Sequence, residues 1–302
     1  MKPEQYLDEQ ISSLKNKTII VTGANSGIGF ETTKMAAYKK ARVVLACRSE
    51  KNALRAIEEI KQSLPEAKLE YVIYDQASFK SIDSFVETII EKYPDFDSLF
   101  LNAGILKPKQ ETYTKDGFPL VLGTNFYGVY YLLEKLSPFL KKTKKEKRVI
   151  IEGSLIARWS SYHGDKYDLI KTSSLSFHAY NISKIGLENL FYKSAKENKN
   201  KHLKFILSEP GICKTDIIKN FPSWIKGPAN SFFKIFTHSP MKGSLCSLHA
   251  MSEKHDNGDI VIPSGLFSVN GFPKVRSEFF KRTKRYERII EDTKIIIESK
   301  TS

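Results

Sequence analysis

Short runs rich in Val and Ile alternate with longer helical patterns along most of this 302-residue chain. Apolar runs that are too short for helices and are bounded by turn residues are typical of strands buried on both faces of a parallel sheet. We expect seven such strands, at Thr18–Thr22, Arg42–Cys47, Leu69–Tyr74, Ser98–Asn102, Arg148–Glu152, Lys204–Ser208 and Asp259–Ile262. The helical patterns between them lie at Gly27–Tyr38, Glu50–Leu64, Ser78–Tyr93, Leu120–Leu140, Tyr180–Lys196 and Lys242–Met251. This alternation predicts an α/β fold of Rossmann type, a doubly wound parallel sheet of about seven strands with helices on both faces.

No internal repeat, low-complexity linker or change of composition marks a domain boundary in the sequence. Its 41% hydrophobic and 27% charged residues are ordinary for a globular protein that buries a sizeable core. We therefore expect one domain over residues 1–302, with a core at about 17–263 and a helical extension at 264–302. The last part of the extension is amphipathic, and the sequence leaves open whether it packs on the body or on a partner.

The net charge of +14 raises the question of nucleic-acid binding, because basic patches bind phosphate backbones. Much of the excess lies in two short runs, at 141–148 and 281–288. The first run follows a helical pattern that ends near Leu140, where cations suit the negative end of the helix dipole and face water. We therefore expect no nucleic-acid partner. The alternative would show as oligonucleotide binding that weakens steeply with salt.

The three cysteines, Cys47, Cys213 and Cys246, are far apart and form neither a CxxC pair nor a Cys/His cluster with metal-ligand spacing. Free thiols in a reducing compartment are the expected state, without a bound metal. Residues 1–17 carry scattered charges and no apolar stretch of the length that a signal peptide or a membrane span needs. These features predict a cytoplasmic protein that does not span a membrane.

A glycine-rich turn joins the first expected strand to the first helical pattern, and it reads Thr22-Gly23-Ala24-Asn25-Ser26-Gly27-Ile28-Gly29. Gly23 permits a tight turn, Gly27 lets the backbone approach a pyrophosphate, and Gly29 allows the helix to pack closely on the strand. The helix N-terminus presents free N–H groups and a positive dipole end to phosphates. A plain turn could have the same composition, but the position between a strand and a helix favours nucleotide binding.

The end of the second strand indicates which coenzyme would bind. In NAD-binding folds an acidic residue near this point holds the ribose 2′-hydroxyl, whereas an Arg suits a 2′-phosphate. The strand ends Leu45-Ala46-Cys47-Arg48 and carries no carboxylate. Because the Arg48 guanidinium is a planar fork that matches phosphate, we expect NADP(H). An ordinary surface arginine is the alternative interpretation.

Tyr180 and Lys184 stand four residues apart at the start of a helical pattern, so both side chains share one helix face. A free tyrosine has a pKa of about 10, and a neighbouring ammonium group would lower it by favouring phenolate. Such a pair can donate and accept a proton, although the spacing alone is common on helix surfaces.

Together these motifs resemble the short-chain dehydrogenase/reductase family over nearly the whole chain, to about Ile262. The matching motifs are Thr22 to Gly29, Asp75 after the third strand, Asn102-Ala103-Gly104 after the fourth, Asn125, Ser154, Tyr180 with Lys184, and Pro210-Gly211 with Thr215. The resemblance implies hydride transfer between a nicotinamide coenzyme and a carbonyl or alcohol substrate. In such a reaction the protein supplies orientation, a donor aimed at the developing alkoxide and a tuned proton source.

The resemblance also implies a role for each matched residue. Tyr180 would be the general acid in reduction and the base in oxidation, and Lys184 would bind the nicotinamide ribose and lower the tyrosine pKa. Ser154 would hold the substrate oxygen, and Asn125 would anchor a water in the proton relay. The coenzyme contacts beyond the glycine-rich turn would be Arg48 at the 2′-phosphate, Asp75 and Gln76 by the adenine, Asn102, Ala103 and Gly104 along the ribose, and Pro210, Gly211, Ile212 and Thr215 beside the nicotinamide.

Asn25-Ser26 in the turn and the strand end at Arg48 are similar to the group of retinol dehydrogenases, protochlorophyllide reductases and the WW-domain oxidoreductase. A long insert between Ser154 and Tyr180 also suits this group. The sequence departs from the family at Glu152-Gly153-Ser154, where a pair of serines is usual, and no membrane anchor precedes the domain.

An aromatic segment at 221–236 is expected either to cover an apolar substrate as a lid or to pack a helix onto the core. The rival function is a redox sensor or interaction protein that binds NADP(H) without physiological turnover. The four catalytic residues favour an enzyme, while Glu152 keeps the rival open. Members of the family often associate through the helices that correspond to Leu120–Leu140 and Tyr180–Lys196. The lysine-rich end of the first helix would oppose such contact, so a homodimer and a monomer both stay open.

Overall fold

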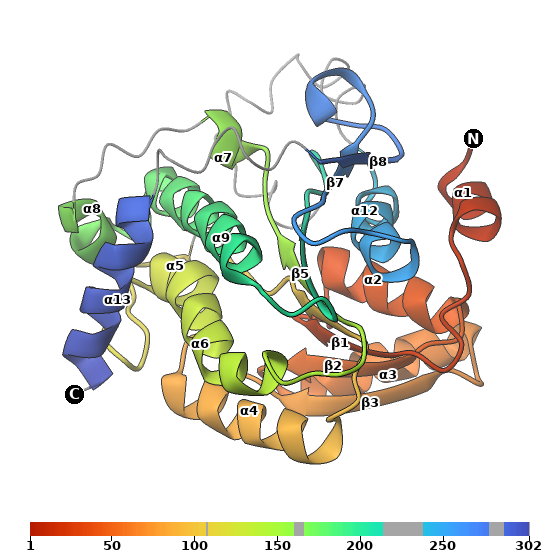
Figure 1. Cartoon of the computed structure of the whole chain (residues 1–302), viewed down its shortest axis with the longest axis horizontal. Helices are drawn as coiled ribbons and strands as arrows, with labels where there is room; N and C mark the ends of the chain where they lie inside the picture. Colours follow the sequence, from red (N-terminus) through yellow and green to blue (C-terminus); the bar gives the residue numbers. More distant parts are fainter. Residues whose placement is uncertain (107, 160–165, 214–237, 278–286, 302) are drawn as a thin grey trace.

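The computed structural model of the protein describes residues 1–106, 108–159, 166–213, 238–277 and 287–301. Within these residues, eight strands form one sheet in the order β3-β2-β1-β4-β5-β6-β7-β8 (Figure 1). They are β1 (Thr18–Thr22), β2 (Arg42–Cys47), β3 (Lys68–Ile73), β4 (Ser98–Leu101), β5 (Lys147–Glu152), β6 (Leu203–Ser208), β7 (Ile260–Pro263) and β8 (Pro273–Arg276). Neighbouring strands are parallel from β3 to β7, and β8 pairs with β7 in the antiparallel direction. The predicted doubly wound parallel sheet is confirmed, with one strand more than expected.

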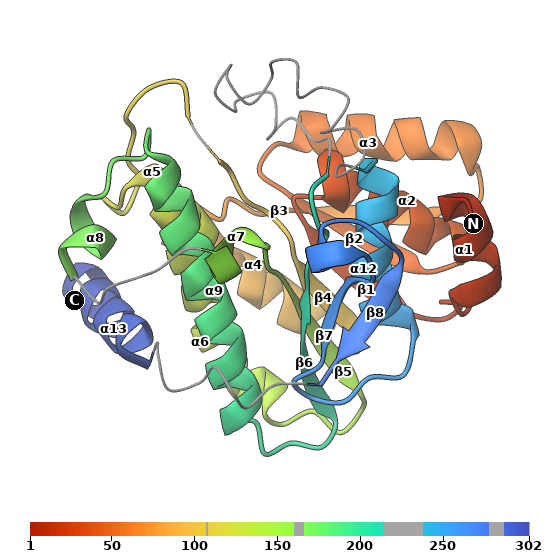
Figure 2. The ribbon, with the colours of Figure 1, turned by 90° about the horizontal axis from the view of Figure 1, so that it is seen from above.

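Helices cover both faces of the sheet (Figure 2). One layer comprises α4 (Phe79–Lys92), α5 (Leu120–Leu122), the π-helical turn η1 (Gly123–Tyr127), α6 (Gly128–Leu140) and α9 (Phe177–Glu197). The other comprises α1 (Pro3–Gln10), α2 (Gly27–Tyr38), α3 (Glu50–Ser63) and α12 (Pro240–Ser252). The predicted helices are thus found within a few residues of their expected bounds, except that the pattern at Leu120–Leu140 is divided by η1.

Successive residues of the central strands face opposite layers, which explains the continuous apolar runs in the sequence. In β2, Val44 and Ala46 belong to the core under α4, α6 and α9, whereas Val43 and Leu45 belong to the core under α2, α3 and α12. A strand buried on both faces has no solvent side, so it shows no polar alternation.

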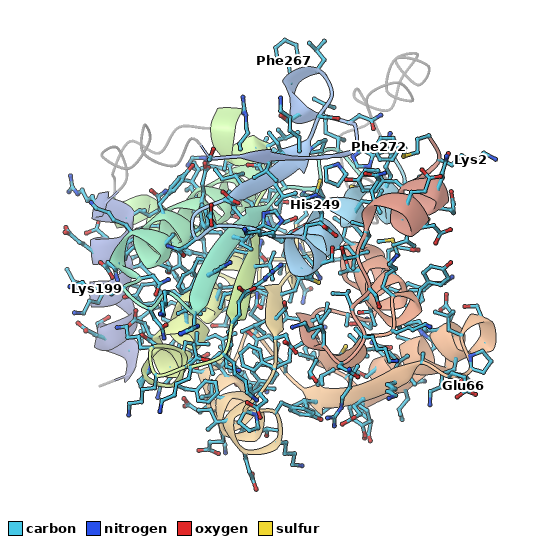
Figure 3. All side chains as sticks on the ribbon, turned by 45° about the vertical axis from the view of Figure 1, so that its right-hand side comes forward. Lys2, Glu66, Lys199, His249, Phe267 and Phe272 are labelled. Atoms are coloured by element: carbon cyan, nitrogen blue, oxygen red, sulfur yellow. The ribbon has the colours of Figure 1, made fainter. Side chains whose placement is uncertain are left out.

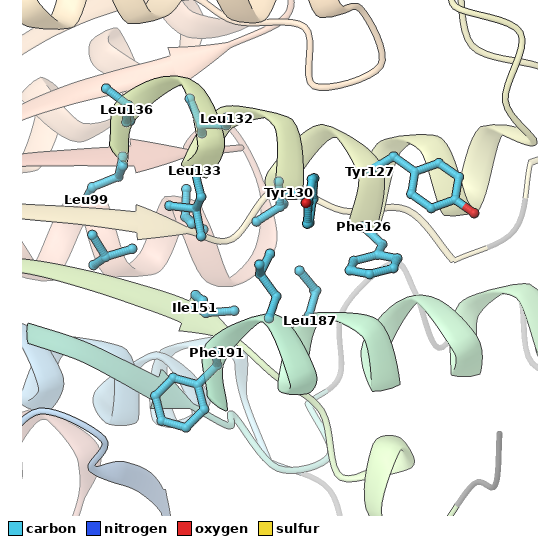
Figure 4. Packing of buried hydrophobic residues seen from close by; sticks show 14 of the residues in the cluster. Leu99, Phe126, Tyr127, Tyr130, Leu132, Leu133, Leu136, Ile151, Leu187 and Phe191 are labelled. Carbon is cyan, nitrogen blue, oxygen red and sulfur yellow. The ribbon is translucent and has the colours of Figure 1, made fainter. Parts of the chain in front are cut away.

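The α6–α9 layer packs through leucines and aromatic rings around the sheet (Figure 4). Phe126 of η1 lies against α9 at Gly186, where an added Cβ would come within 2.6 Å of the phenyl ring. Any larger residue at this position would push α9 away from η1. The close contact therefore fixes the turn that carries Asn125 next to the helix that carries Tyr180 and Lys184.

The sequence did not predict two elements at the rim of the sheet, α1 and β8. Strand β8 is short, begins with a proline and exposes most of its residues, as an edge strand can, so it lacks the apolar pattern of a buried strand. Helix α1 has many charges but buries Leu7, and its Tyr6 ring stacks on Phe272 with ring centroids 4.8 Å apart. Phe272 precedes β8 and lies beside α1 in Figure 3.

The C-terminal helix α13 (Glu287–Thr301) packs on the body of the same chain. Ile289, Ile290, Ile296 and Ile297 are buried in the α6–α9 core, and the helix lies against α9 and α8 (Lys166–Lys171) (Figure 1). The question left open by the sequence is thereby answered for this helix. The expected helical extension at 264–302 also contains β8 and a single 3₁₀ turn, η3 (Leu266–Ser268).

The structure describes, to different extents, two long segments that lie between expected strands and helices. The stretch at 155–179 contains two short helices, α7 (Ile156–Trp159) and α8. The stretch at 215–240, including the aromatic segment at 221–236, lies outside the described residues up to residue 237. Among the helices that are described, none combines the length and the apolar character needed to cross a bilayer.

Candidate active site

The candidate site lies at the carboxyl edge of the sheet, where β1 and β4 lead the chain to opposite sides. Ligands of open α/β sheets bind in the crevice at such a reversal of strand order. Four of the predicted motifs follow strands directly at this edge: the glycine-rich turn after β1, Asn102 to Gly104 after β4, Ser154 after β5, and Pro210–Gly211 after β6. The fold therefore brings together segments that are far apart in the sequence.

Glycine is required at three positions of the turn after β1, two for their backbone conformation and one for close packing. Gly23 and Gly27 have positive φ angles of 67° and 56°, which side chains rarely adopt. A Cβ at Gly29 would lie 2.4 Å from the carbonyl oxygen of Gly23 and 2.4 Å from Nδ2 of Asn102. The first turn of α2 is thus seated directly on the end of β1.

The N-terminus of α2 is open for an anion. Ser26 occupies the N-cap position with an extended backbone, and its side chain makes no capping hydrogen bond. The first N–H groups of a helix have no acceptor within the helix, and they carry the positive end of its dipole. A turn that only a glycine permits and an uncapped helix start together fit a pyrophosphate group.

Asn102 fastens the end of β4 to this turn. Its Nδ2 donates to the carbonyl oxygens of Thr22 at 2.8 Å and Gly23 at 3.4 Å. The Thr22 hydroxyl oxygen accepts hydrogen bonds from the backbone N–H groups of Asn102 at 2.9 Å and Ala103 at 3.0 Å. The Asn102 side chain therefore shapes the glycine-rich turn after β1. The segment that follows Asn102 borders the crevice.

The side chains of the neighbouring residues Asp75 and Gln76 have different surroundings. The Gln76 side chain is buried, and its Nε2 donates to the carbonyl oxygens of Ala103 at 2.9 Å and Thr124 at 2.6 Å. Its amide thus joins the segment after β4 to η1 instead of facing the solvent. Asp75 is half-buried, and its Oδ1 accepts a hydrogen bond from the N–H of Ala77 at 3.1 Å.

Arg48 follows the last residue of β2 and is exposed. Within the part of the chain that the structure describes, its guanidinium makes no ion pair and no side-chain hydrogen bond. The fork of donors is therefore free to take an external anion at the end of the second strand.

Tyr180 in α9 lies near Ser154, which follows β5. Burial raises the pKa of Tyr180 to about 12, against the lowering effect of the nearby Ser154 hydroxyl, while the carboxyl of Glu152 adds to the rise. The phenol is therefore protonated at neutral pH. The lowering expected from Lys184 does not outweigh burial in this geometry.

The Lys184 ammonium group points at the end of β5, and its Nζ donates to the carbonyl oxygen of Glu152 at 2.9 Å. It lies 5.8 Å from the centroid of the Tyr180 ring. Burial lowers the pKa of Lys184, and the carboxylates of Glu152 and Glu209 oppose this shift. The lysine is thus held one helical turn beyond the tyrosine, on the same face of α9.

Asn125 is buried in the π-helical turn η1, a type of irregularity that is frequent at functional sites. Its Oδ1 accepts from the N–H of Ile105 at 2.8 Å, and its Nδ2 donates to the Ile105 carbonyl at 2.7 Å and to the Ser183 hydroxyl at 3.2 Å. The whole side-chain amide joins the segment after β4 to α9.

The segment after β6 is fixed by the hairpin between β7 and β8. Gly211 has a φ of 72°, and a Cβ there would lie 2.4 Å from the carbonyl oxygen of Val269. The N–H of Ile212 donates to this same oxygen at 3.0 Å. Pro210, Gly211 and Ile212 therefore stand at the site, whereas Thr215 lies outside the described residues.

Sequence reasoning missed several groups behind the catalytic residues. Glu209, Ser247 of α12 and His238 are buried near the ends of β5 and β6. Glu209 could have been noticed as a carboxyl directly after a buried strand, while nothing marked Ser247 or His238 in the sequence. Within the described ranges, no group of three or more His, Cys, Asp or Glu side chains is arranged to hold a metal ion.

Known proteins share both the fold and the sequence pattern. A short chain dehydrogenase of Shigella flexneri, solved with NADP, is 20% identical and superimposes with a TM-score of 0.60 over 81% of this chain and 94% of its own. A short-chain dehydrogenase/reductase of Phomopsis amygdali is 36% identical over 60% of this chain and 57% of its own length. Human retinol dehydrogenase 14 is 26% identical over 81% of this chain and 76% of its own.

The WW domain-containing oxidoreductase of Gallus gallus is 36% identical over 46% of this chain and 33% of its own length. Together with retinol dehydrogenase 14, it confirms the predicted resemblance to that group of oxidoreductases. The family model described as short chain dehydrogenase matches residues 17–226, well over half of the chain. This chain therefore belongs to the short chain dehydrogenase family.

Proposed function

We propose that this chain is an NADP(H)-dependent oxidoreductase in which Tyr180 transfers a proton to or from the oxygen of a carbonyl or alcohol. The observation that carries the proposal is that Tyr180, Ser154 and Lys184 lie together at the carboxyl edge of the sheet, the edge that also carries the glycine-lined start of α2. We further propose that residues 1–302 form a single nucleotide-binding domain.

The coenzyme would be held from the turn after β1 to the segment after β6. The uncapped start of α2 would take the pyrophosphate, and the exposed Arg48 would take the 2′-phosphate. Asp75 and the backbone from Asn102 to Gly104 would border the adenosine half, with Gln76 shaping that wall from inside. When bound, the nicotinamide supplies or accepts the hydride at the substrate carbon.

The chain's own residues would manage the proton. In reduction, the phenolic O–H of Tyr180 donates its proton to the carbonyl oxygen as the hydride reaches the carbon, while Ser154 orients that oxygen. The raised pKa of Tyr180 keeps this proton in place at neutral pH, which suits reduction. Oxidation would need phenolate, and so should be favoured at alkaline pH.

An apolar substrate is our proposal for the natural reaction. Two relatives are named for apolar alcohols, human retinol dehydrogenase 14 and the polyprenol dehydrogenase of Danio rerio. The aromatic segment at 221–236 would serve as the cover, although it lies outside the described residues. Comparing turnover on aromatic and aliphatic aldehydes with turnover on small polar carbonyls tests this part, since better turnover of the polar compounds would contradict it.

Coenzyme choice is tested by titrating the protein with NADPH and NADH. We expect tighter binding of NADPH, and we expect Arg48→Ala to weaken NADPH binding with little effect on NADH. Arg55→Ala is a matched control, because it removes another exposed arginine, from helix α3. Equal affinity for the two coenzymes would remove Arg48 from its assigned role.

Catalysis is tested with Tyr180→Phe, which keeps the ring and removes the proton. We expect NADPH binding to persist while NADPH-dependent carbonyl reduction falls by about 10²- to 10⁴-fold. A protein that binds NADPH but reduces no carbonyl compound, with Tyr180→Phe identical to wild type, would instead support the redox-sensor or interaction protein.

A further inference from the structure

Glu152 is a buried carboxyl directly behind the proposed catalytic residues. It ends β5, two residues before Ser154, and its side chain is only 4% exposed. Because β5 lies between the two helix layers, this position is reached by α9 from one face and by α12 from the other (Figure 2). A carboxyl that is removed from water at such a point requires a physical reason, since burying a charge is costly unless it is paired.

The backbone and the side chain of Glu152 contact different helices. Its carbonyl oxygen accepts the hydrogen bond from Lys184 Nζ on α9 at 2.9 Å. Its Oε2 accepts a hydrogen bond from the Ser247 hydroxyl on α12 at 3.1 Å, and that hydroxyl is also hydrogen-bonded to Ser208 of β6 at 3.0 Å. Its Oε1 is buried and has no hydrogen-bond partner among the residues that the structure describes. The carboxyl is thus half satisfied, and the remaining attraction available to it is the field of a nearby cation.

Lys184 brings a cation close to this residue, because its ammonium group is hydrogen-bonded to the backbone carbonyl of Glu152. Within the residues that the structure describes, the titratable groups that act on Glu152, or on which it acts, come from α9, α12 and the segment after β6, and they are Tyr180, Lys184, Glu209, Cys213 and Cys246. Among them only Lys184 carries a positive charge. Burial raises the pKa of Glu152, against the lowering effect of the Lys184 charge. Burial likewise lowers the pKa of Lys184, against the raising effect of Glu152.

We propose that Glu152 is a positioning residue whose carboxylate keeps Lys184 protonated as the pH rises, and so extends to higher pH the range in which the site binds its coenzyme. This inference rests on the proposed function, in which Lys184 binds the nicotinamide ribose. A neutral residue at position 152 would remove one of the two carboxylates, Glu152 and Glu209, that oppose the loss of the Lys184 proton. Lys184 would then lose its proton at lower pH.

The pH dependence of NADPH binding tests the proposal without a known substrate. The dissociation constant of NADPH is measured from pH 7 to 10 for the full-length wild type and for Glu152→Gln, which keeps the shape of the side chain and removes its charge. We expect the alkaline midpoint, where binding weakens, to move down by about one pH unit or more in Glu152→Gln. Between the two midpoints this corresponds to up to about tenfold weaker binding.

Two further variants separate charge from packing. Glu152→Asp keeps a carboxylate and should hold the midpoint near that of wild type. Asp259→Asn is a matched control, because it removes a buried carboxylate before β7, at the opposite end of the strands, where Asp259 bonds His255. It should leave the midpoint unchanged. If Glu152→Gln does not fold, Glu152→Ser, which also removes the charge with a smaller polar side chain, replaces it.

The outcomes are distinguishable. A midpoint that moves down in Glu152→Gln, but not in Glu152→Asp or Asp259→Asn, supports the proposal. An unmoved midpoint in Glu152→Gln, or wild-type binding that is constant from pH 7 to 10, overturns the role of Glu152 while the proposed function stands. Failure of the wild type to bind NADPH at any of these pH values overturns the proposed function and this inference with it.

Discussion

Replacing Gly29 by alanine should damage both the fold and the coenzyme site, by an amount that follows from the contacts of one added atom. The Cβ would lie 2.4 Å from the Gly23 carbonyl oxygen, a backbone atom of the phosphate turn, and 2.4 Å from Nδ2 of Asn102. Real Cβ contacts essentially never fall below 3.0 Å, so the start of α2 must move away from the end of β1. Overpacking of a well-packed interior costs about 1–3 kcal/mol.

The size of this cost sets the expected measurements. We expect the free energy of unfolding to fall by about 1–3 kcal/mol in urea denaturation. Because the helix start that would bind the pyrophosphate is displaced, NADPH affinity should fall by about tenfold or more, which corresponds to about 1.4 kcal/mol. Gly123→Ala is the control for overpacking alone, since its Cβ would lie 2.3 Å from Cγ2 of Thr114, a residue outside the proposed coenzyme site. It should lower stability without lowering NADPH affinity. Wild-type NADPH affinity in Gly29→Ala would refute the reasoning.

Three further changes test the packing, the turn and the buried carboxyl. Ile289→Ala in α13 should destabilise the protein by about 2–5 kcal/mol in urea denaturation, because Ile289 is fully buried. Ile295→Ala, at a residue 52% exposed, should change stability by less than about 0.5 kcal/mol. Equal effects would contradict the packing of α13 on the body. Asn102→Ala should lower the free energy of unfolding by about 1–3 kcal/mol, because it leaves the carbonyl groups of Thr22 and Gly23 without their donor. It should also weaken NADPH binding in a fluorescence titration. Unchanged affinity would contradict the role of Asn102 in shaping the turn. The folded pKa of Glu152 is raised, so the unfolded chain releases this proton first and stability falls as the pH rises from the ordinary carboxyl pKa of 4.5 toward the raised value. The stability of wild type relative to Glu152→Gln, from urea midpoints between pH 5 and 8, should therefore decline with pH, and a constant difference would contradict the raised pKa.

Most of the architecture could be predicted from the sequence because the central strands are buried on both faces. Runs such as Arg42–Cys47 must then be apolar at nearly every position, and the helices between them must be amphipathic, so both patterns are strong. Strand β8 could not be found in this way. It lies at the edge, pairs on one side only and exposes Lys274, Val275 and Arg276, so no periodic pattern distinguishes it from a loop.

The site residues could be named from the sequence, but their contacts could not. The order of the motifs places Asn102, Gln76 and Asn125 at the crevice. In the structure, each of these side-chain amides forms hydrogen bonds that join two segments of the chain. Such contacts depend on distances between elements far apart in the chain, which no local pattern encodes. The same holds for Glu152. Its position two residues before Ser154 was visible in the sequence, but its contacts with Ser247 and Lys184 depend on the fold.

Transfer of deuterium from NADPH labelled at nicotinamide C4 to an aldehyde tests the account most directly. The labelled position must be the one from which hydride departs, so both C4 stereoisomers are used with a series of aromatic and aliphatic aldehydes. The account predicts that one of the two labelled isomers places deuterium on the carbinol carbon of the alcohol product, and that Tyr180→Phe slows this transfer by about 10²-fold or more. NADPH binding without deuterium in any alcohol product, or transfer at an equal rate in Tyr180→Phe, would contradict it.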